Sequence, residues 1–244
     1  MAEGGNGSFT AESRPDKDWL GEGWYRDLGI CLDAAKRHDL QMWIFDEDWW
    51  PSQTVGGKVP VERAAKALTA SAVAVGQGGA CESGFAAHPN FVAMIAGRLE
   101  ADGTVDATTL IDLSPLAADG KVAWSPPSGS GNWQVMEFRW ETAPRLKQGK
   151  RYAIDGMSAD CVDGYLRTVY QPHHERFGKD FGGTIPGYFY DEPETPGDWG
   201  TELADTFKSM GVDWMPAFVA WKFKLSGEAQ DAAFYQYAEA RAET

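Results

Sequence analysis

Three adjacent acidic residues at the end of a short apolar run constrain this chain more than any other feature. Met42 to Phe45 form the run, and Asp46, Glu47 and Asp48 follow it directly. Because its apolar residues are continuous rather than alternating, the run predicts a strand that is buried on both faces. Neighbouring carboxylates repel one another and gain no core contact, so stability alone explains them poorly. A functional site at the end of the strand explains them better.

A second acidic cluster lies far along the chain. The segment 185–190 predicts another buried strand, which Pro193 ends because proline lacks the N–H that a central strand donates. Three acidic residues surround this end: Asp191, Glu192 and Glu194. Barrel enzymes keep their catalytic groups at the carboxyl ends of parallel strands. We therefore expect Glu47 and Glu192 to share one mouth of a curved parallel sheet. The competing interpretation of each cluster is an ordinary solvated acidic turn.

Aromatic residues accompany the first cluster. Trp49 and Trp50 follow Asp48 directly. Aromatic faces beside carboxylates suit a sugar ring, whose C–H faces stack on the aromatic ring while its hydroxyl groups bond to acids. Core packing explains two tryptophans equally well. The expected substrate-binding residues are Asp46, Asp48, Trp49, Trp50 and Asp191.

The composition limits the classes of partner. The formal net charge is −14, which disfavours a nucleic-acid backbone or an anionic membrane as partner. No apolar run approaches the roughly 20 residues that span a bilayer, and nothing resembles a signal peptide. The Gly-rich start reads as loop, as in a chain whose true start is missing. The compartment and the oligomeric state stay open.

Cysteine and histidine give no metal-binding pattern. Three scattered cysteines lack metal-ligand spacing: Cys31, Cys81 and Cys161. His173 and His174 are adjacent, so only one of them can face inward. We interpret that one as an interfacial histidine rather than a ligand.

The order of predicted elements indicates an interrupted α/β domain. A helix over 22–38 and a strand over 41–45 give the rhythm of α/β proteins. Residues 1–68 are the first part of a barrel domain, 69–150 an inserted all-β module, and 151–244 the continuation. A closed barrel takes roughly 200–250 residues by itself. The expected fold class is therefore α/β, an incomplete (β/α)8 TIM barrel with an inserted antiparallel β module. A smaller α/β sheet is the alternative.

Several individual elements are also expected. Residues 1–20 show no periodicity and are predicted to be loop. Residues from Val135 on alternate roughly, as in a half-exposed antiparallel strand. A helix begins near Ser158, and Pro172 kinks or ends it. The short strands of the module are predicted at 73–75, 91–99, 110–113, 122–124 and 133–140. After the module, strands are predicted at 152–154 and 214–219, and helices near 201–210 and 227–241.

Two motifs carry a resemblance to a known family. Residues 45–52 read Phe-Asp-Glu-Asp-Trp-Trp-Pro-Ser, with Gly56 and Gly57 after them, and residues 187–193 read Gly-Tyr-Phe-Tyr-Asp-Glu-Pro. The first resembles the Tyr-Asp-Glu-Asp-x-Trp-Pro-Ser…Gly-Gly signature of glycoside hydrolase family 106, the α-L-rhamnosidases and relatives. The second is similar to that family's other strand-end acid motif. Residues 53–55 depart from the family pattern.

The resemblance implies a chemistry and a role for each acid. It implies hydrolysis of a terminal α-L-rhamnoside with inversion, aided by calcium, in a barrel whose first and last strands have no counterpart here. Glu47 and Glu192 would be the two catalytic carboxylates, one protonating the leaving oxygen and the other activating water, in an order that stays open. Inversion needs the two carboxylates about 6.5–9.5 Å apart. The remaining acids would orient sugar hydroxyls or a hard cation, with the metal ligands unassigned.

Two rival functions remain. One is a non-catalytic carbohydrate-binding protein, in which Trp49, Trp50 and the β module hold glycan without cleaving it. The other is an inactive fragment of the hydrolase, since an open barrel lacks part of its pocket wall.

Overall fold

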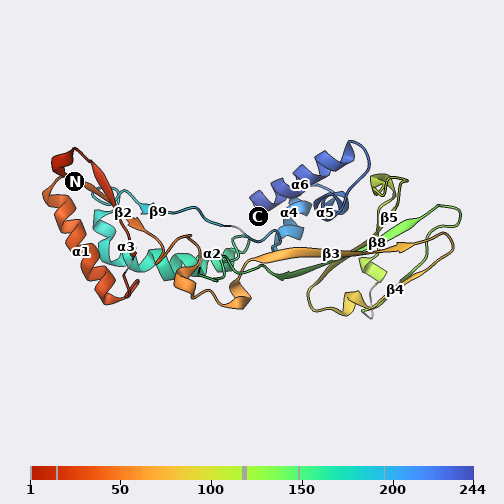
Figure 1. Cartoon of the computed structure of the whole chain (residues 1–244), viewed down its shortest axis with the longest axis horizontal. Coiled ribbons are helices and arrows are strands. Elements are labelled where there is room, and N and C mark those ends of the chain that lie inside the picture. The colour runs from red at the N-terminus through yellow and green to blue at the C-terminus, as the bar shows by residue number, and fades with distance from the viewer. Residues whose placement is uncertain (1, 15, 117–119, 148, 195) are drawn as a thin grey trace. The chain divides into compact units, whose positions relative to one another are not determined.

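The computed structural model describes residues 2–14, 16–116, 120–147, 149–194 and 196–244. The chain forms two compact units, each made from two separate segments of sequence. Unit 1 comprises Met1–Ala65 and Ala143–Pro196, and unit 2 comprises Lys66–Thr142 and Gly197–Thr244. Figure 1 shows the elements of both units along the chain.

Unit 1 is built on a small parallel sheet. Its strands are β1 (Ser8–Ala11), β2 (Gln41–Phe45) and β9 (Tyr188–Phe189), in the order β1-β2-β9. Both pairings are parallel, and Phe45 lies opposite Phe189. Met42, Ile44 and Phe45 are fully buried. The strand predicted at 41–45 is therefore confirmed, including its burial on both faces.

The prediction that residues 1–20 are loop is wrong at β1. Four residues are too few to show a period of two, so the sequence pattern gave no signal. The strand exists because Ser8 to Ala11 pair with Gln41 to Ile44. Strand β1 is thus a parallel strand that precedes the first acidic motif, and the sequence pattern had not indicated it.

One long helix covers the parallel sheet. Helix α1 (Glu22–Arg37) confirms the helix predicted at 22–38 and lies beside β2 (Figure 1). Trp24, Leu28 and Leu32 recur at helical spacing and are buried in one cluster with Met42 and Ile44. The amphipathic pattern thus fixes which side of α1 faces the strands.

A helical run in the second segment of unit 1 contains Pro172. Its parts are α2 (Ala159–Tyr165), a π-helical segment (Leu166–Tyr170) and α3 (Gln171–Phe177). Pro172 was expected to kink or end the helix, but it lies in the first turn of α3. A proline is tolerated there because its missing N–H has no acceptor within the new helix. The wider π turn before it absorbs the change in hydrogen bonding.

The strand predicted at 152–154 does not form. Ile154 makes a single antiparallel bridge with Ala64, and the residues around it are irregular. The apolar triplet reflects burial of Ile154 in the core of unit 1 rather than sheet formation.

Unit 2 contains the antiparallel sheet that the sequence predicted. Its order is β3-β8-β5-β6, and a separate two-stranded pair joins β4 to β7. The strands are β3 (Lys66–Val75), β4 (Cys81–Ser83), β5 (Phe91–Arg98), β6 (Ile111–Asp112), β7 (Val122–Trp124) and β8 (Trp133–Thr142).

Strand β8 was expected to be half-exposed from Val135 on, which holds for residues 139–142 but not for residues 135–138, because these are buried. Met136 and Phe138 are buried in the cluster that the sheet shares with the C-terminal helices. Val135, on the opposite face, is buried in the cluster with β4 and β7. Glu137 is also buried there, where its carboxylate accepts a hydrogen bond from the Ser83 hydroxyl. The polar residue Glu137 in the alternating pattern therefore makes a buried hydrogen bond and does not lie on a solvent-exposed face.

Three helices complete unit 2: α4 (Leu203–Met210), α5 (Trp214–Lys222) and α6 (Ala229–Glu243). The helices predicted near 201–210 and 227–241 are confirmed, but the strand predicted at 214–219 is wrong. Asp213 begins α5 by accepting a hydrogen bond from the N–H of Met215. A helix this apolar has the same sequence appearance as a buried strand.

The C-terminal helices pack on the antiparallel sheet. Phe218 of α5 contacts Phe138 of β8 with ring centroids 5.5 Å apart, and the two belong to one buried cluster. Residues 197–244 therefore join 66–142 in unit 2, whereas the sequence analysis assigned 151–244 to the barrel domain. Figure 1 shows the same association.

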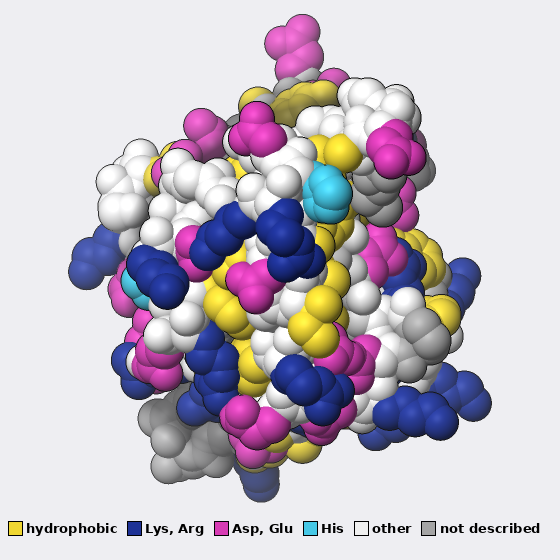
Figure 2. All heavy atoms as spheres, turned by 90° about the vertical axis from the view of Figure 1, so that its left-hand side faces the viewer, with side chains coloured by type: hydrophobic (Ala, Val, Ile, Leu, Met, Phe, Trp, Pro, Cys, Tyr) yellow, Lys and Arg dark blue, Asp and Glu magenta, His cyan; other side chains and the backbone are white. Residues whose placement is uncertain are grey.

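The observed fold is mixed α/β with small, open sheets. A closed barrel is not present among the described residues, because the parallel sheet has three strands and two edges. No helix in the described part of the chain has the length and apolarity needed to cross a membrane. On the face drawn in Figure 2, Lys and Arg side chains intermingle with Asp and Glu, so the net negative charge forms no continuous acidic surface there.

Replacing Phe218 by Ala tests the packing of the C-terminal helices on the sheet. Phe218 is 3% exposed, so we expect a loss of about 3–5 kcal/mol in the free energy of unfolding, measured in urea. Tyr235→Ala is the control, because Tyr235 is 70% exposed on α6 and should cost less than about 1 kcal/mol. Equal costs for the two variants would contradict the packing described here.

Candidate functional site

Polar residues follow all three strands of the parallel sheet. Ser13 comes after β1, the acids Asp46 to Asp48 after β2, and Asp191 and Glu192 after β9. Because Phe45 and Phe189 are opposite each other in parallel strands, the residues after them lie at the same edge of the sheet. The structure thus brings the two acidic motifs together, as parallel pairing of their strands requires.

Ser52 bonds the two motifs directly. Its hydroxyl donates to Asp46 Oδ1 at 2.6 Å and accepts from the backbone N–H of Asp191 at 3.0 Å. Its own N–H donates to the carbonyl of Asp191 at 3.1 Å. Ser52 is fully buried, so these bonds are shielded from water. The serine in the first motif therefore fixes the strand end of the second.

Asp46 is fully buried and bonds to three hydroxyl groups. Besides Ser52, the phenol groups of Tyr165 and Tyr170 both donate to Asp46 Oδ2, at 2.9 Å and 2.5 Å. Burial raises the pKa of Asp46, and the hydroxyl groups oppose the shift. Asp46 was expected to bind substrate, but here it joins β2 to the helical run of unit 1.

Glu47 is fully buried and holds the loop that follows it. Its Oε2 accepts the N–H groups of Thr54 and Val55 at 2.8 Å and 2.7 Å. Its Oε1 accepts the N–H groups of Asp48 and Gly56 at 3.0 Å and 2.5 Å. Four backbone donors thus surround one carboxylate, an arrangement typical of an anion-binding nest. Burial raises the pKa of Glu47 to about 7, opposed by the same N–H groups.

The loop adopts an unusual backbone conformation around this carboxylate. Gly56 and Gly57 have φ values of 61° and 78°, which glycine adopts readily. Val55 has a φ of 51°, which is strained for a β-branched residue. The bond from its N–H to Glu47 helps to hold that conformation. Gly56 of the first motif is therefore explained by its N–H bond to Glu47, whereas the N–H of Gly57 donates to the carbonyl of Thr54.

Asp48 forms an ion pair that the sequence analysis did not anticipate. Both its oxygens accept from the guanidinium of Arg151, with Nη2 at 3.1 Å from Oδ2. The Ser13 hydroxyl donates to the backbone carbonyls of Glu47 and Asp48. Nothing in the sequence pattern marked Arg151 or Ser13, because both reach the acidic motif from distant segments.

The exposed part of this edge carries one carboxylate and one aromatic ring. Glu192 is exposed and has a φ of 40°, and Trp49 is 50% exposed. The guanidinium of Arg14 lies 5.8 Å from the ring centroid of Trp49. Trp50 is half-buried, and its indole Nε1 has no hydrogen-bond partner among the described residues. Glu192 is therefore an acid that is open to solvent at this edge, and the half-buried Asp191 precedes it in the chain.

The acidic cluster does not fit the calcium ion that the resemblance implies. Calcium needs several oxygen atoms with free lone pairs. The oxygens of Asp46, Glu47 and Asp48 already accept from hydroxyl, backbone N–H and guanidinium groups. Within the described ranges, no three His, Cys, Asp or Glu side chains are grouped to hold a metal.

His173 has the interfacial position that the sequence predicted. It is fully buried, its Nε2 accepts from the indole Nε1 of Trp24 at 2.9 Å, and its Nδ1 donates to the Val169 carbonyl at 2.6 Å. Both ring nitrogens are used, so the ring is neutral. Burial lowers the pKa of His173 to about 4. The residue joins α1 to α3.

The buried histidine predicts a pH dependence of stability. In the unfolded chain His173 binds a proton below pH 6.5, whereas in the folded chain it does so only near pH 4. Stability should therefore fall as the pH drops from about 6.5 to 4, by up to about 3 kcal/mol from this residue. Glu47 acts in the opposite direction between 4.5 and about 7, because its raised pKa keeps a proton on the folded state.

A variant of His173 separates its contribution to the pH dependence of stability from that of Glu47. His173→Gln should be less stable than the parent at pH 7 but should lack the histidine contribution, so the difference between the two proteins shrinks towards pH 4. Urea unfolding at a series of pH values measures it. A difference that is constant with pH would show that the pKa of His173 is the same in the folded and unfolded chains.

Replacing Glu47 by Gln tests its role in holding the loop. A Gln side chain presents an NH₂ group to N–H donors, so two of the four donors lose their acceptor. We expect the free energy of unfolding to fall by about 2–4 kcal/mol. Glu192→Gln removes the same charge from an exposed position and should change it by less than about 0.5 kcal/mol. If both changes cost the same, Glu47 does not hold the loop.

Comparison with known proteins shows that the fold of this chain is similar to that of a solved structure. No protein-family model matches the chain, and no curated protein matches its sequence. The chain is similar to the structure of a rhamnosidase from Novosphingobium sp. PP1Y, with a TM-score of 0.60 and 12% identity. The match covers 87% of this chain and 37% of the rhamnosidase, so the chain spans little more than a third of that protein. At this identity the match shows that the fold is rhamnosidase-like, and it does not show membership of glycoside hydrolase family 106.

Proposed function

We propose that this chain is part of the catalytic region of a rhamnosidase-like glycoside hydrolase. In this proposal β1, β2 and β9 are strands of a (β/α)8 barrel, and unit 2 contains the module inserted into it. The observation that carries the proposal is the bonding through Ser52, which holds two acidic motifs at the carboxyl edge of one parallel sheet. Catalytic groups of barrel enzymes lie at this edge. The likeness of fold to a rhamnosidase supports the same conclusion.

The proposed reaction uses Glu47 as acid and Glu192 as base. A pKa of about 7 leaves roughly half of the Glu47 side chains protonated at neutral pH, and the protonated form is the one that a general acid requires. Glu192 is exposed, so it can accept a proton from the attacking water. Protonation of the glycosidic oxygen and attack by water on the opposite face of the ring give inversion. For this role Glu47 must release at least one of its backbone N–H bonds when substrate binds.

The proposed substrate is a terminal α-L-rhamnoside or a similar sugar. Trp49 and the half-buried Trp50 offer ring faces for its C–H groups, and Asp191 offers an acceptor for its hydroxyls. Asp46 and Asp48 support the site through their bonds to Tyr165, Tyr170 and Arg151. Calcium has no assigned place in this proposal, because the acidic cluster has no free set of oxygens to offer.

A second candidate is a protein that binds carbohydrate without cleaving it. The saturation of Glu47 by four N–H groups favours this candidate, because a carboxylate with no free lone pair cannot reach a glycosidic oxygen. Binding isotherms beside a hydrolysis assay distinguish the two. Binding without product at any pH supports the second candidate.

The leaving group of the substrate distinguishes an acid from a purely structural glutamate. In the full-length protein, we expect Glu47→Gln to lose at least about a hundredfold of its activity on an alkyl rhamnoside, the usual contribution of general acid catalysis. A nitrophenyl rhamnoside needs little help from an acid, so its hydrolysis should fall much less. Equal loss on both substrates would assign Glu47 to loop structure and remove it from the mechanism.

The base should respond differently. Glu192→Gln should reduce activity on both substrates by at least about a hundredfold, while the melting temperature stays unchanged. Tyr235→Ala is the matched control on an exposed residue of unit 2 and should keep parental activity. Parental turnover in Glu192→Gln would end the case for this carboxylate.

A further inference from the structure

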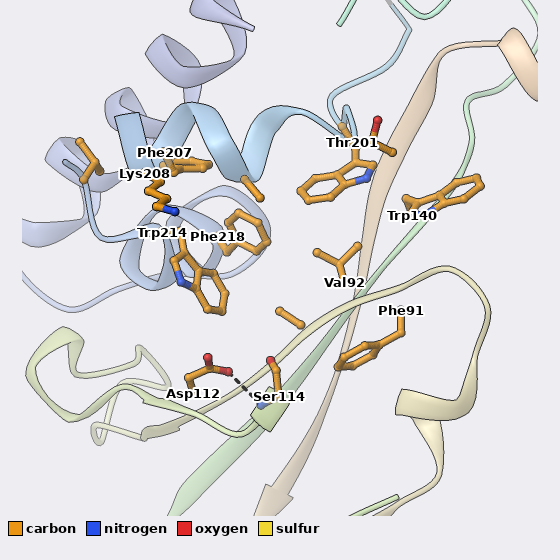
Figure 3. Close-up of a pocket in the computed structure, with 14 residues that line it drawn as sticks. Phe91, Val92, Asp112, Ser114, Trp140, Thr201, Phe207, Lys208, Trp214 and Phe218 are labelled. Carbon is orange, nitrogen blue, oxygen red and sulfur yellow. Dashed lines mark hydrogen bonds between the residues drawn. The ribbon is translucent and has the colours of Figure 1, made fainter. Parts of the chain in front are cut away.

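A cavity lies entirely within unit 2, and none of its lining residues belongs to the acidic motifs. Its volume is about 760 Å³, and it lies between strands β5, β6 and β8 and helices α4 and α5. This size is within the range of sites for small organic ligands. Figure 3 shows the side chains that line it. The proposed hydrolysis uses none of these residues.

Aromatic rings line the cavity from two sides. Trp214 and Phe218 come from α5, while Phe91 and Trp140 come from β5 and β8 (Figure 3). Trp214 and Phe218 contact each other edge to face at 5.1 Å, which orients the two rings. Phe91, Trp140 and Trp214 are only half-buried, so their rings are open to a ligand. The walls therefore offer flat apolar surfaces rather than a closed core.

Polar groups that still have unused hydrogen-bonding capacity accompany these rings. Trp199 lines the cavity and is 6% exposed, and its indole Nε1 has no hydrogen-bond partner in the described part of the chain. Lys208 is exposed and forms no ion pair with any described residue. Asp112 accepts one hydrogen bond, from the N–H of Ser114 at 2.8 Å, through Oδ1. Two donors and an acidic acceptor thus remain for a ligand.

These features select one class of ligand. A purely apolar molecule would leave the buried indole N–H of Trp199 without a partner, which costs free energy, and would offer no donor to Asp112. A phosphate or other anion would meet the carboxylate of Asp112 as well as the ammonium of Lys208. A sugar ring has C–H faces for the aromatic walls and hydroxyl groups that donate and accept. Donors and acceptors around aromatic rings are what such a ring requires.

We propose that the unit 2 cavity is a binding site for a neutral glycosyl unit. The indole N–H of Trp199 and the ammonium of Lys208 donate to its hydroxyls, and Asp112 accepts from them. Its ring stacks on Trp140 or Trp214. The residues of this site belong to unit 2, whereas Glu47 and Glu192 belong to unit 1, so the site holds glycan whether or not those carboxylates cleave it.

Binding of simple methyl glycosides tests the proposal. The probes are methyl α-L-rhamnopyranoside and methyl β-D-glucopyranoside, and the readouts are tryptophan fluorescence and saturation-transfer NMR on the intact chain. We expect saturable binding of at least one probe with a Kd on the order of 1 mM, as suits a ligand with so few atoms. The absence of saturable binding of either probe overturns the proposal.

Variants locate the binding within the cavity. Trp214→Ala removes one wall and should weaken binding at least about tenfold, as loss of an aromatic anchor does. Lys208→Met changes an exposed helix residue without disturbing the core, so it tests the site even if Trp214→Ala is unstable. Tyr235→Ala is the control and should bind as the parent does. Parental binding in Lys208→Met and a folded Trp214→Ala would place the sugar elsewhere and overturn the proposal.

The result is distinguishable from failure of the proposed hydrolysis. Glu192→Gln should bind the probes with parental affinity in unit 2 even though it no longer cleaves a rhamnoside. A chain that binds but never hydrolyses loses the proposed function and keeps this site. A chain that hydrolyses but shows no effect of Lys208→Met or Trp214→Ala on binding keeps the function and loses this site.

Discussion

The acidic edge of unit 1 depends on the burial of carboxylates that are bonded to neighbouring groups. Asp46 and Glu47 are both fully buried, which would be costly for isolated charges. Hydroxyl groups surround the first and backbone N–H groups surround the second. The two adjacent acids therefore bond to different parts of unit 1: Asp46 bonds to the helical run, and Glu47 bonds to the loop that follows it. Ser52 adds the second strand end, so one buried network holds Asp46 and Glu47 and the backbone of Asp191.

The sequence predicted the elements whose signal is local. The amphipathic spacing of Trp24, Leu28 and Leu32 gave α1, and the continuous apolar run gave β2 with its burial. Failures came where tertiary contacts decide. Residues 214–219 are apolar all round and form a helix once Asp213 caps it, and Ser8 to Ala11 form a strand because β2 is beside them.

The sequence predicted which acidic residues lie at the candidate site, but it did not predict what most of them bond to. The two acidic motifs do lie at one edge, because parallel strands bring their carboxyl ends together. The internal bonds of Asp46, Glu47 and Asp48 were invisible in the sequence, since their partners are backbone groups or residues such as Tyr165 and Arg151 from distant segments. The cavity of unit 2 was missed for the same reason, as its walls come from strands and helices far apart in sequence.

The interleaving of the two units affects how the chain can fold during synthesis. Unit 1 needs residues up to Pro196, and unit 2 needs residues up to Thr244, while the first segment of each is made much earlier. Strands β3, β5 and β8 therefore leave the ribosome before the helices that cover one of their faces exist. Until those helices are made, this apolar face of the sheet stays uncovered, and uncovered apolar surface in an incomplete chain favours aggregation.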